Sequence, residues 1–277
     1  MPELPEVEIT ARNLRRWTKG RRIERIEPDP KARYVFRPAT PTAFARGLEG
    51  ARFGNIRRIG KHLLVSMMKK DGAPVGLLAH LGMTGKWLRR DGDAAPSRFS
   101  RARFHLDDGA VLHFDDMRLF GRLRVVPGAR FDEVREIAEL GPDPLEQGID
   151  LDRLAEALGR SKLAVKVRIM DQALLPGVGN IVASESLFRA KVDPRRQARS
   201  LARAEVRKLA DGILATVKET IAREDSPEIS YVEEPGSENP FLVYAREGEK
   251  CPRCRRAEIV RVVQAQRSTF FCPRCQR

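Results

Sequence analysis

The chain has 277 residues, and its 52 Lys and Arg against 38 Asp and Glu give a formal net charge of +14. Hydrophobic residues make up 42% of it, which allows packed cores and excludes a disordered chain. The basic balance favours nucleic acid as partner over an anionic membrane surface, and no apolar run approaches the roughly 18 residues of a membrane span. The N-terminus lacks the basic start and the apolar stretch of a secretory signal, so we expect a cytoplasmic protein. The length of the chain predicts about two domains of roughly 150 residues each.

The first half of the chain predicts a helix followed by short strands. Pro5 suits the first turn of a helix over residues 5–17, and Glu6 suits its positive end. Turn signals at residues 70–72 and 107–109, each between apolar runs, then predict two hairpins. Strands at such short spacing favour a β-sandwich. We therefore predict an α+β protein whose residues 1–125 form a β-sandwich domain with an N-terminal helix.

The second half has helical patterns. Gly and Pro cluster around residues 127–144, so a linker is predicted over residues 126–150. A helical domain is predicted over residues 151–240, with helices at residues 151–158, 162–171, 180–190 and 201–223. Its last part, residues 225–240, is rich in Pro, Ser and Glu and is typical of a mobile loop.

All four cysteines lie in the last 27 residues, in two C-x2-C pairs separated by 17 residues: Cys251, Cys254, Cys272 and Cys275. This spacing predicts one structural Zn2+, because four thiolates leave no open coordination position. The alternative of two disulfides is disfavoured in a reducing compartment. Residues 241–277 are predicted to form a zinc finger hairpin, and their nine Lys and Arg against three Glu make it strongly basic.

The N-terminus offers a nucleophile. Removal of Met1 is expected because the second residue is small, and it would leave Pro2 as a secondary amine. Such an amine can attack an aldehyde-like carbon and form an iminium intermediate. Glu3 stands beside it as a candidate acid/base residue. The simpler alternative is a proline that only stiffens the entry to the helix.

The N-terminal string of residues 2–8, Pro-Glu-Leu-Pro-Glu-Val-Glu, resembles the start of formamidopyrimidine-DNA glycosylases, in the family that includes endonuclease VIII. Similar motifs follow in order along nearly the whole chain. They are Gly60-Lys61-His62, residues 80–85, residues 116–121, Gly179-Asn180 with residues 183–188, Tyr244 and the four cysteines. The resemblance implies two domains with a DNA groove between them, and a helix-two-turn-helix in the helical domain.

The resemblance also assigns roles. Pro2 would be the nucleophile on sugar C1′ and Glu3 the acid/base residue. Lys61 and Asn180 would hold the phosphates around the lesion, and Arg267 would be the essential arginine that binds a phosphate. Further contacts to the DNA backbone are implied for His80, Lys166 and Tyr244, and a wedge that fills the gap left by the extruded base for Met83, Arg118 and Phe120. Taken singly, Met83 and Phe120 are better explained as core, Lys61 as a solvated charge and Asn180 as a helix cap, and only the ordered set of motifs favours the functional roles.

The implied function is base excision repair. The enzyme would be a DNA-formamidopyrimidine glycosylase that removes oxidised purines, with lyase activity at the abasic site. Its partner would be damaged double-stranded DNA, and we expect a monomer that uses no membrane and no nucleotide cofactor. Two alternatives stay open: an endonuclease VIII-like enzyme for oxidised pyrimidines, and a zinc-ribbon protein that binds nucleic acid without catalysis. Leu4 favours the purine enzyme, because endonuclease VIII proteins usually have Gly there.

Overall fold

The computed structural model describes residues 2–92, 94–229, 231–232, 236 and 238–277, and its contacts divide the chain into two compact units. Unit 1 comprises Met1–Ala138 and Glu224–Glu234, and unit 2 comprises Glu139–Arg223 and Pro235–Arg277. No helix among the described residues is long and apolar enough to cross a membrane.

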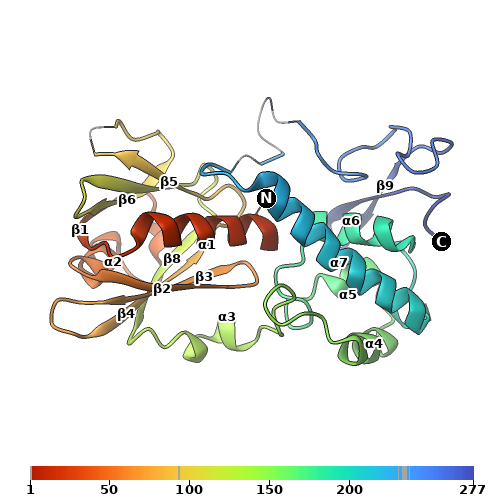
Figure 1. Cartoon of the computed structure of the whole chain (residues 1–277), viewed down its shortest axis with the longest axis horizontal. Helices are drawn as coiled ribbons and strands as arrows, with labels where there is room; N and C mark the ends of the chain where they lie inside the picture. Colours follow the sequence, from red (N-terminus) through yellow and green to blue (C-terminus); the bar gives the residue numbers. More distant parts are fainter. Residues whose placement is uncertain (1, 93, 230, 233–235, 237) are drawn as a thin grey trace. The chain divides into compact units, whose positions relative to one another are not determined.

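Unit 1 is built on two four-stranded antiparallel sheets (Figure 1). The first has the order β1 (Ile23–Pro28), β6 (Ser100–Leu106), β7 (Ala110–Asp115) and β5 (Lys86–Asp91). The second has the order β2 (Arg52–Ile59), β3 (His62–Met68), β4 (Pro74–His80) and β8 (Arg122–Pro127). Alternate side chains of both sheets, such as Leu63 and Val65 on β3 and Phe104 on β6, share one core. The predicted hairpins and the α+β class are confirmed.

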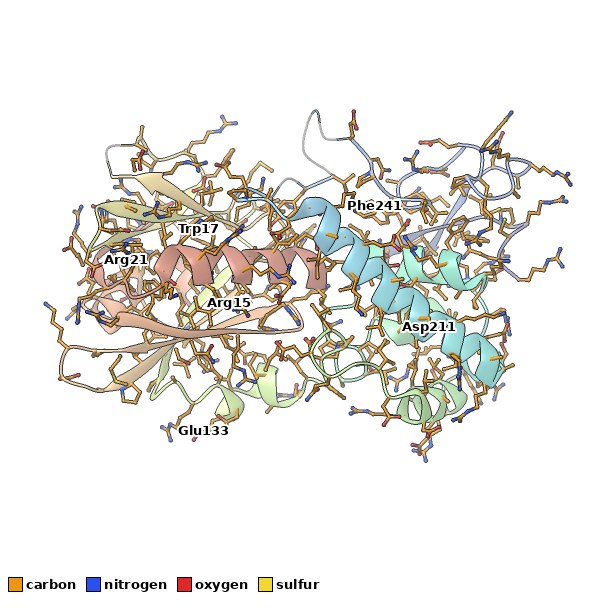
Figure 2. The ribbon with its side chains drawn as sticks, viewed as in Figure 1. Arg15, Trp17, Arg21, Glu133, Asp211 and Phe241 are labelled. Atoms are coloured by element: carbon orange, nitrogen blue, oxygen red, sulfur yellow. The ribbon has the colours of Figure 1, made fainter. Side chains whose placement is uncertain are left out.

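Helix α1 (Leu4–Thr18) lies along the sheets, with β5 and β6 on one side and β2 and β3 on the other in Figure 1. It matches the predicted helix within one residue at each end. Val7, Ala11 and Leu14 enter the shared core from its apolar face. Arg15, labelled in Figure 2, donates from Nε to the Ile56 carbonyl on β2 at 2.8 Å.

A second helix, α2 (Pro41–Leu48), interrupts the strands, and the sequence prediction missed it. The sequence does contain a local signal for the start of this helix. Thr40 caps it by accepting a hydrogen bond from the Ala43 N–H, and Pro41 occupies the first turn. The remaining short helices of unit 1 are η1 (Arg33–Phe36), η2 (Phe131–Glu133) and α3 (Arg135–Ala138).

A buried ion pair joins α1 to the second sheet. Arg58 on β2 is fully buried, and its Nε donates to Glu8 Oε2 at 3.0 Å. Its Nη1 donates to the carbonyl of Gly60, at 3.2 Å, in the turn between β2 and β3. Arg12 and Arg15 also contact the Glu8 carboxylate from solvent-facing positions. One arginine therefore holds the helix and the turn in a single arrangement.

The start of the segment expected to be a mobile loop is attached to unit 1. Asn13 on α1 donates to the carbonyl of Ser226 at 2.8 Å. The Tyr231 hydroxyl is buried and donates to the carbonyl of Gly85 at 2.6 Å. Residues 230, 233–235 and 237 of the segment lie outside the described residues. What is described of its first half is thus anchored to α1 and to the start of β5 in unit 1.

Unit 2 is helical and ends in a hairpin. Its helices are α4 (Leu151–Gly159), α5 (Val165–Ile169), α6 (Asn180–Ala190), η3 (Ala198–Ser200) and α7 (Arg203–Glu224). The hairpin consists of β9 (Val260–Gln264) and β10 (Arg267–Phe271). Helix α5 is shorter than the predicted 162–171, because Ala164 instead forms a β-bridge with Gln197. The helical domain and the C-terminal hairpin are confirmed.

We predict that Arg58→Met lowers the free energy of unfolding by about 1–3 kcal/mol, because Glu8 Oε2 loses its buried partner while Arg12 and Arg15 still contact Oε1. The double variant Glu8→Leu/Arg58→Met removes both charges and should be more stable than Arg58→Met alone. Urea unfolding of the three proteins measures this. A double variant less stable than the single one would show that the pair itself, and not the orphaned charge, is what matters.

Candidate functional site

The start of α1 brings Pro2, Glu3 and Glu6 together. Pro2 and both glutamates are buried. Glu3 is the N-cap residue and accepts from the Glu6 N–H, while Glu6 Oε2 accepts from the Glu3 N–H at 2.8 Å. Burial, followed by the charges of Glu3 and Glu224, raises the pKa of Glu6 from 4.5 to about 7. The turn beside Pro2 therefore holds a carboxyl group that can take up or release a proton near neutral pH.

Lys61 lies in the two-residue turn between β2 and β3. The preceding Gly60 has φ +54°, a left-handed conformation that glycine adopts without strain. The Gly60 carbonyl is the one that Arg58 binds. Gly60 is buried and Lys61 half-buried, so the lysine is the residue of this turn that reaches the surface.

The predicted wedge consists of two loops that a buried aspartate ties together. Asp116 is fully buried, and its Oδ1 accepts from the Thr84 hydroxyl at 2.6 Å. Its Oδ2 accepts from the Gly121 N–H at 2.7 Å. The Thr84 hydroxyl oxygen also accepts from the Arg118 N–H at 3.1 Å. Residues 82–85 and 116–121 are thus one hydrogen-bonded unit, a contact that sequence motifs alone do not give.

The wedge presents its side chains outward. Phe120 is 48% exposed and Arg118 is also exposed, with its guanidinium 5.1 Å from the Phe120 ring centroid. Met83 is half-buried in the other loop. The interpretation of Phe120 as core is wrong, because a core phenylalanine would not be half exposed. Met117 is 55% exposed and was not anticipated from the sequence.

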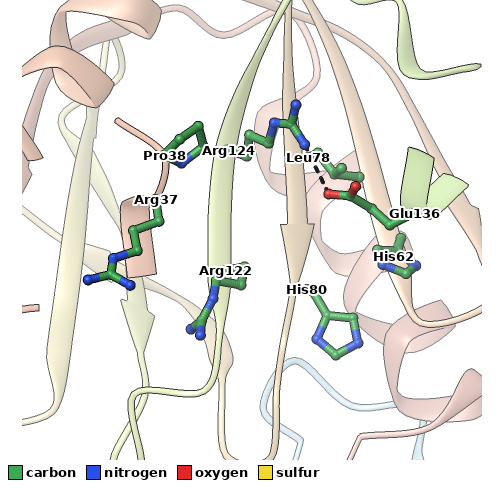
Figure 3. A pocket seen from close by; sticks show the side chains of 8 residues that line it. All are labelled: Arg37, Pro38, His62, Leu78, His80, Arg122, Arg124 and Glu136. Carbon is green, nitrogen blue, oxygen red and sulfur yellow. Dashed lines mark hydrogen bonds and ion pairs between the residues drawn. The ribbon is translucent and has the colours of Figure 1, made fainter. Parts of the chain in front are cut away.

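His80 lines a basic pocket of about 320 Å³ together with His62, Arg37, Arg122 and Arg124 (Figure 3). Its Nδ1 accepts from the Gly82 N–H at 3.0 Å, so the ring carries its proton on Nε2. Burial, and then the nearby His62, Lys61 and Arg122, lower the pKa of His80 from 6.5 to about 3. His80 is therefore a neutral hydrogen-bond donor and not a cation.

In unit 2, Lys166 of α5 lies between Asn180 at the start of α6 and the start of β10, where Arg267 is the first residue. Asn180 is the first residue of α6, whose N-cap Gly179 has no side chain to cap the helix. Arg267 is exposed and begins β10, directly after the hairpin turn. Lys166 is fully buried, with Nζ among protein acceptors. Its geometry does not favour the direct backbone contact that the sequence suggested, because a buried ammonium held by protein oxygens has no route to a phosphate.

Tyr244 sits in a loop that Glu185 holds. The Glu185 carboxylate, 2% exposed, accepts from the backbone N–H groups of Leu242, Val243 and Tyr244 at 2.9 Å each. The Tyr244 ring packs edge-on against Phe270 of β10, with ring centroids 5.3 Å apart. Glu185 was missed as a site residue, since a buried glutamate in a helix gives no sign of its partner in the sequence.

The four cysteines form a metal site. Cys251, Cys254, Cys272 and Cys275 place their sulfurs within 4.8 Å of one another. The Cys251–Cys275 and Cys254–Cys272 sulfur pairs are both 3.8 Å apart. This is too far for a disulfide and matches the roughly 3.8 Å edge of a tetrahedron with Zn–S bonds of about 2.3 Å. The predicted single structural Zn2+ fits these residues, and it would fix the two ends of the hairpin that presents Arg267.

The lowered pKa of His80 predicts a loss of stability in acid. Between pH 6.5 and about 3 the unfolded chain binds a proton that the folded protein does not, so stability falls as the pH decreases through this window. The loss from this group is at most about 1.4 kcal/mol per pH unit. His80→Asn keeps an acceptor for the Gly82 N–H and should flatten the decline. Urea unfolding at a series of pH values measures it, and parallel curves for both proteins would contradict the assignment.

The comparisons with known proteins cover the whole chain. Three family models match: the formamidopyrimidine-DNA glycosylase N-terminal domain over residues 1–123, its H2TH domain over residues 140–230, and the zinc finger found in FPG and IleRS over residues 248–277. The chain is 39% identical to the formamidopyrimidine-DNA glycosylase of Acidiphilium cryptum and 38% identical to that of Desulfitobacterium hafniense, over 100% of each protein.

Solved structures agree. The MutM (Fpg) protein from Thermus thermophilus is 36% identical with a TM-score of 0.81, over 99% of this chain and 98% of that one. Lactococcus lactis Fpg in complex with DNA containing an abasic site is 28% identical with a TM-score of 0.86, over 99% of both chains. The match of all three domain models in order, with relatives that align from end to end, shows that the chain belongs to the formamidopyrimidine-DNA glycosylase family.

Proposed function

We propose that the protein removes oxidised purines, namely formamidopyrimidines and 8-oxoguanine, from double-stranded DNA and then cleaves the strand at the abasic site. The observation that carries the proposal is the start of α1, where Pro2 and Glu3 lie beside Glu6, a carboxyl group whose pKa is raised to about 7. Among the similar structures, Lactococcus lactis Fpg is bound to DNA that contains Fapy-dG, which supports this substrate class.

The chemistry follows from these residues. The Pro2 nitrogen, once free of Met1, attacks C1′ of the sugar as the bond from C1′ to the base breaks. The base leaves with a proton from a carboxyl group, and the nitrogen loses its own proton. The C1′–O4′ bond of the sugar ring then breaks as O4′ takes up a proton, and the nitrogen lone pair forms the iminium with C1′ of the opened sugar. Loss of a proton from C2′ then drives departure of the 3′ phosphate. Glu3 and Glu6 are the groups placed to carry these protons.

The DNA must be held and opened for this attack. Lys61 in unit 1 and Asn180 and Arg267 in unit 2 are proposed to bind phosphates around the lesion, with His80 and Tyr244 as further contacts. Met83, Arg118 and Phe120 are proposed to fill the space of the flipped nucleotide, because the sugar carbon is inaccessible in stacked duplex. Because one chain supplies every proposed group, we propose a monomer that needs no nucleotide cofactor. We also propose that it acts in the cytoplasm, as expected for a bacterial-type enzyme that acts on DNA.

Borohydride trapping tests the proposal directly. During incubation with duplex containing 8-oxoguanine, the wild-type protein should give a covalent protein–DNA adduct, because borohydride reduces the iminium to a stable amine. Pro2→Gly should keep duplex affinity and lose nearly all adduct. Absence of an adduct from the wild-type protein, with DNA still bound, would favour the non-catalytic zinc-ribbon alternative. A stronger reaction with an oxidised pyrimidine would favour the endonuclease VIII-like one.

Arg267 separates a hairpin that binds the lesion's phosphate from one that only adds positive charge. Arg267→Ala should weaken binding of lesion duplex by roughly tenfold to a hundredfold, as expected for loss of a charge-assisted hydrogen bond. Arg256→Ala, an exposed arginine of the same finger, is the control and should cost far less. Affinity is measured for both at one salt concentration. If the two variants bind equally well, Arg267 contributes diffuse charge only.

A further inference from the structure

The ammonium group of Lys166 has no proton left for DNA. Its Nζ donates to Asn180 Oδ1 at 2.5 Å, to Thr269 Oγ1 at 2.7 Å and to the carbonyl of Ser268 at 3.0 Å. A lysine ammonium has three protons and no acceptor, so these three contacts use all of them. The side chain is 0% exposed, and its three partners compensate for the loss of water.

These contacts fix the direction of the Asn180 amide. An ammonium group can only face the amide oxygen, so Oδ1 points to Lys166 and the two Nδ2 protons point elsewhere. Those protons are the donors that a phosphate requires. The adjacent positive charge also polarises the amide and strengthens its N–H groups as donors. Without Lys166, the Asn180 side chain would be free to turn its oxygen toward the phosphate.

The other two contacts reach the strand that begins with Arg267. Ser268 and Thr269 are the next two residues of β10, and Thr269 is fully buried. Arg267 itself is held only lightly, with its Nη1 3.6 Å from the Met170 sulfur. Lys166 on α5 therefore joins the start of α6 to the start of β10. These two starts hold Asn180 and Arg267, the proposed phosphate contacts of unit 2.

We propose that Lys166 is a positioning residue that orders Asn180 and Arg267 for phosphate binding and does not itself contact DNA. This rests on the proposed function, because it assumes that those two residues bind the phosphates of damaged DNA. The competing interpretation is the direct contact of Lys166 with a phosphate. The two differ in salt dependence, because only a direct contact releases a counterion from the DNA.

Lys166→Met tests the proposal with duplex containing a stable abasic analogue, whose affinity is measured over a range of salt concentrations. We expect the affinity of Lys166→Met to fall roughly tenfold to a hundredfold. Because a displaced Arg267 would itself change the salt dependence, the slope of log affinity against log salt is compared in the Arg267→Ala background, where adding Lys166→Met should leave it unchanged. Lys162→Met, an exposed lysine just before α5, is the matched control for lost charge and should bind nearly as the wild type does. A slope shallower by about 0.9 when Lys166→Met is added to Arg267→Ala, or wild-type affinity of Lys166→Met itself, overturns the proposal.

A double-mutant cycle with Asn180→Ala shows whether Lys166 acts through its neighbour. If it does, Lys166→Met/Asn180→Ala should lose less affinity than the sum of the two single losses on the logarithmic scale. Additive losses overturn the link. Arg267→Ala combined with Lys166→Met tests the second arm in the same way, and additivity there removes Arg267 from the proposal.

Thr269→Val keeps the question answerable if Lys166→Met does not fold. This substitution conserves shape and removes one acceptor from Lys166 while leaving Asn180 and Arg267 in place. We expect a loss of affinity of a few fold with the wild-type salt slope, and wild-type affinity would overturn the proposal. All of these measurements read equilibrium binding without chemistry. A failure of borohydride trapping in the wild-type protein would therefore leave their outcome unaffected, so the two proposals fail separately.

Discussion

A buried positive charge without water is tolerated only where oxygen atoms surround it, and this constraint shapes the site in both units. In unit 1 the charge is Arg58, which binds the Glu8 carboxylate and the Gly60 carbonyl. In unit 2 it is Lys166, held by two residues of β10 and by Asn180. Each cation joins segments far apart in sequence, and each cluster has a predicted phosphate contact within it or directly beside it. Order and the proposed recognition are therefore assigned to different cations: the buried ones hold the elements together, and the proposed phosphate contacts Lys61 and Arg267 are more accessible.

The wedge follows the same rule with the opposite charge. Asp116 is a buried carboxylate whose hydrogen bonds close two loops into one unit, and only then do Arg118 and Phe120 project outward as a pair. Glu185 does this for the loop of Tyr244, with three backbone N–H groups as its partners. An exposed apolar side chain such as Phe120 forms no hydrogen bonds of its own that would fix its position. The buried carboxylate of Asp116 provides that order, so the two loops are held together in the protein by itself.

The sequence predicted what depends on local signals. The first helix, the hairpin strands, helix α6 and the zinc hairpin all have turn, cap or spacing patterns that act over a few residues. Helix α2 has such a signal in Thr40-Pro41, which was overlooked. The partners of Lys166 were not predictable, because Ser268 and Thr269 lie about a hundred residues away along the chain. The sequence around a lysine does not distinguish one that binds DNA from one that the fold encloses. The family resemblance therefore pointed to Lys166 but did not show that it is buried.

The proposed chemical groups share one position in their elements, which is the first residue or turn. Pro2 and Glu3 precede α1, Lys61 lies in the turn before β3, Asn180 begins α6 and Arg267 begins β10. The starts of α1 and α6 leave backbone N–H groups without partners in the helix, which suits anions, while the turn before β3 and the start of β10 let a side chain leave the packed core. Helix ends also fray. A residue at such an end can hold a ligand in a fixed position only if other contacts hold the end in place. The Glu3–Glu6 capping box does so at the start of α1, and the Arg58 hydrogen bond to Gly60 does so at the turn of Lys61. The contacts of Lys166 do so at the starts of α6 and β10.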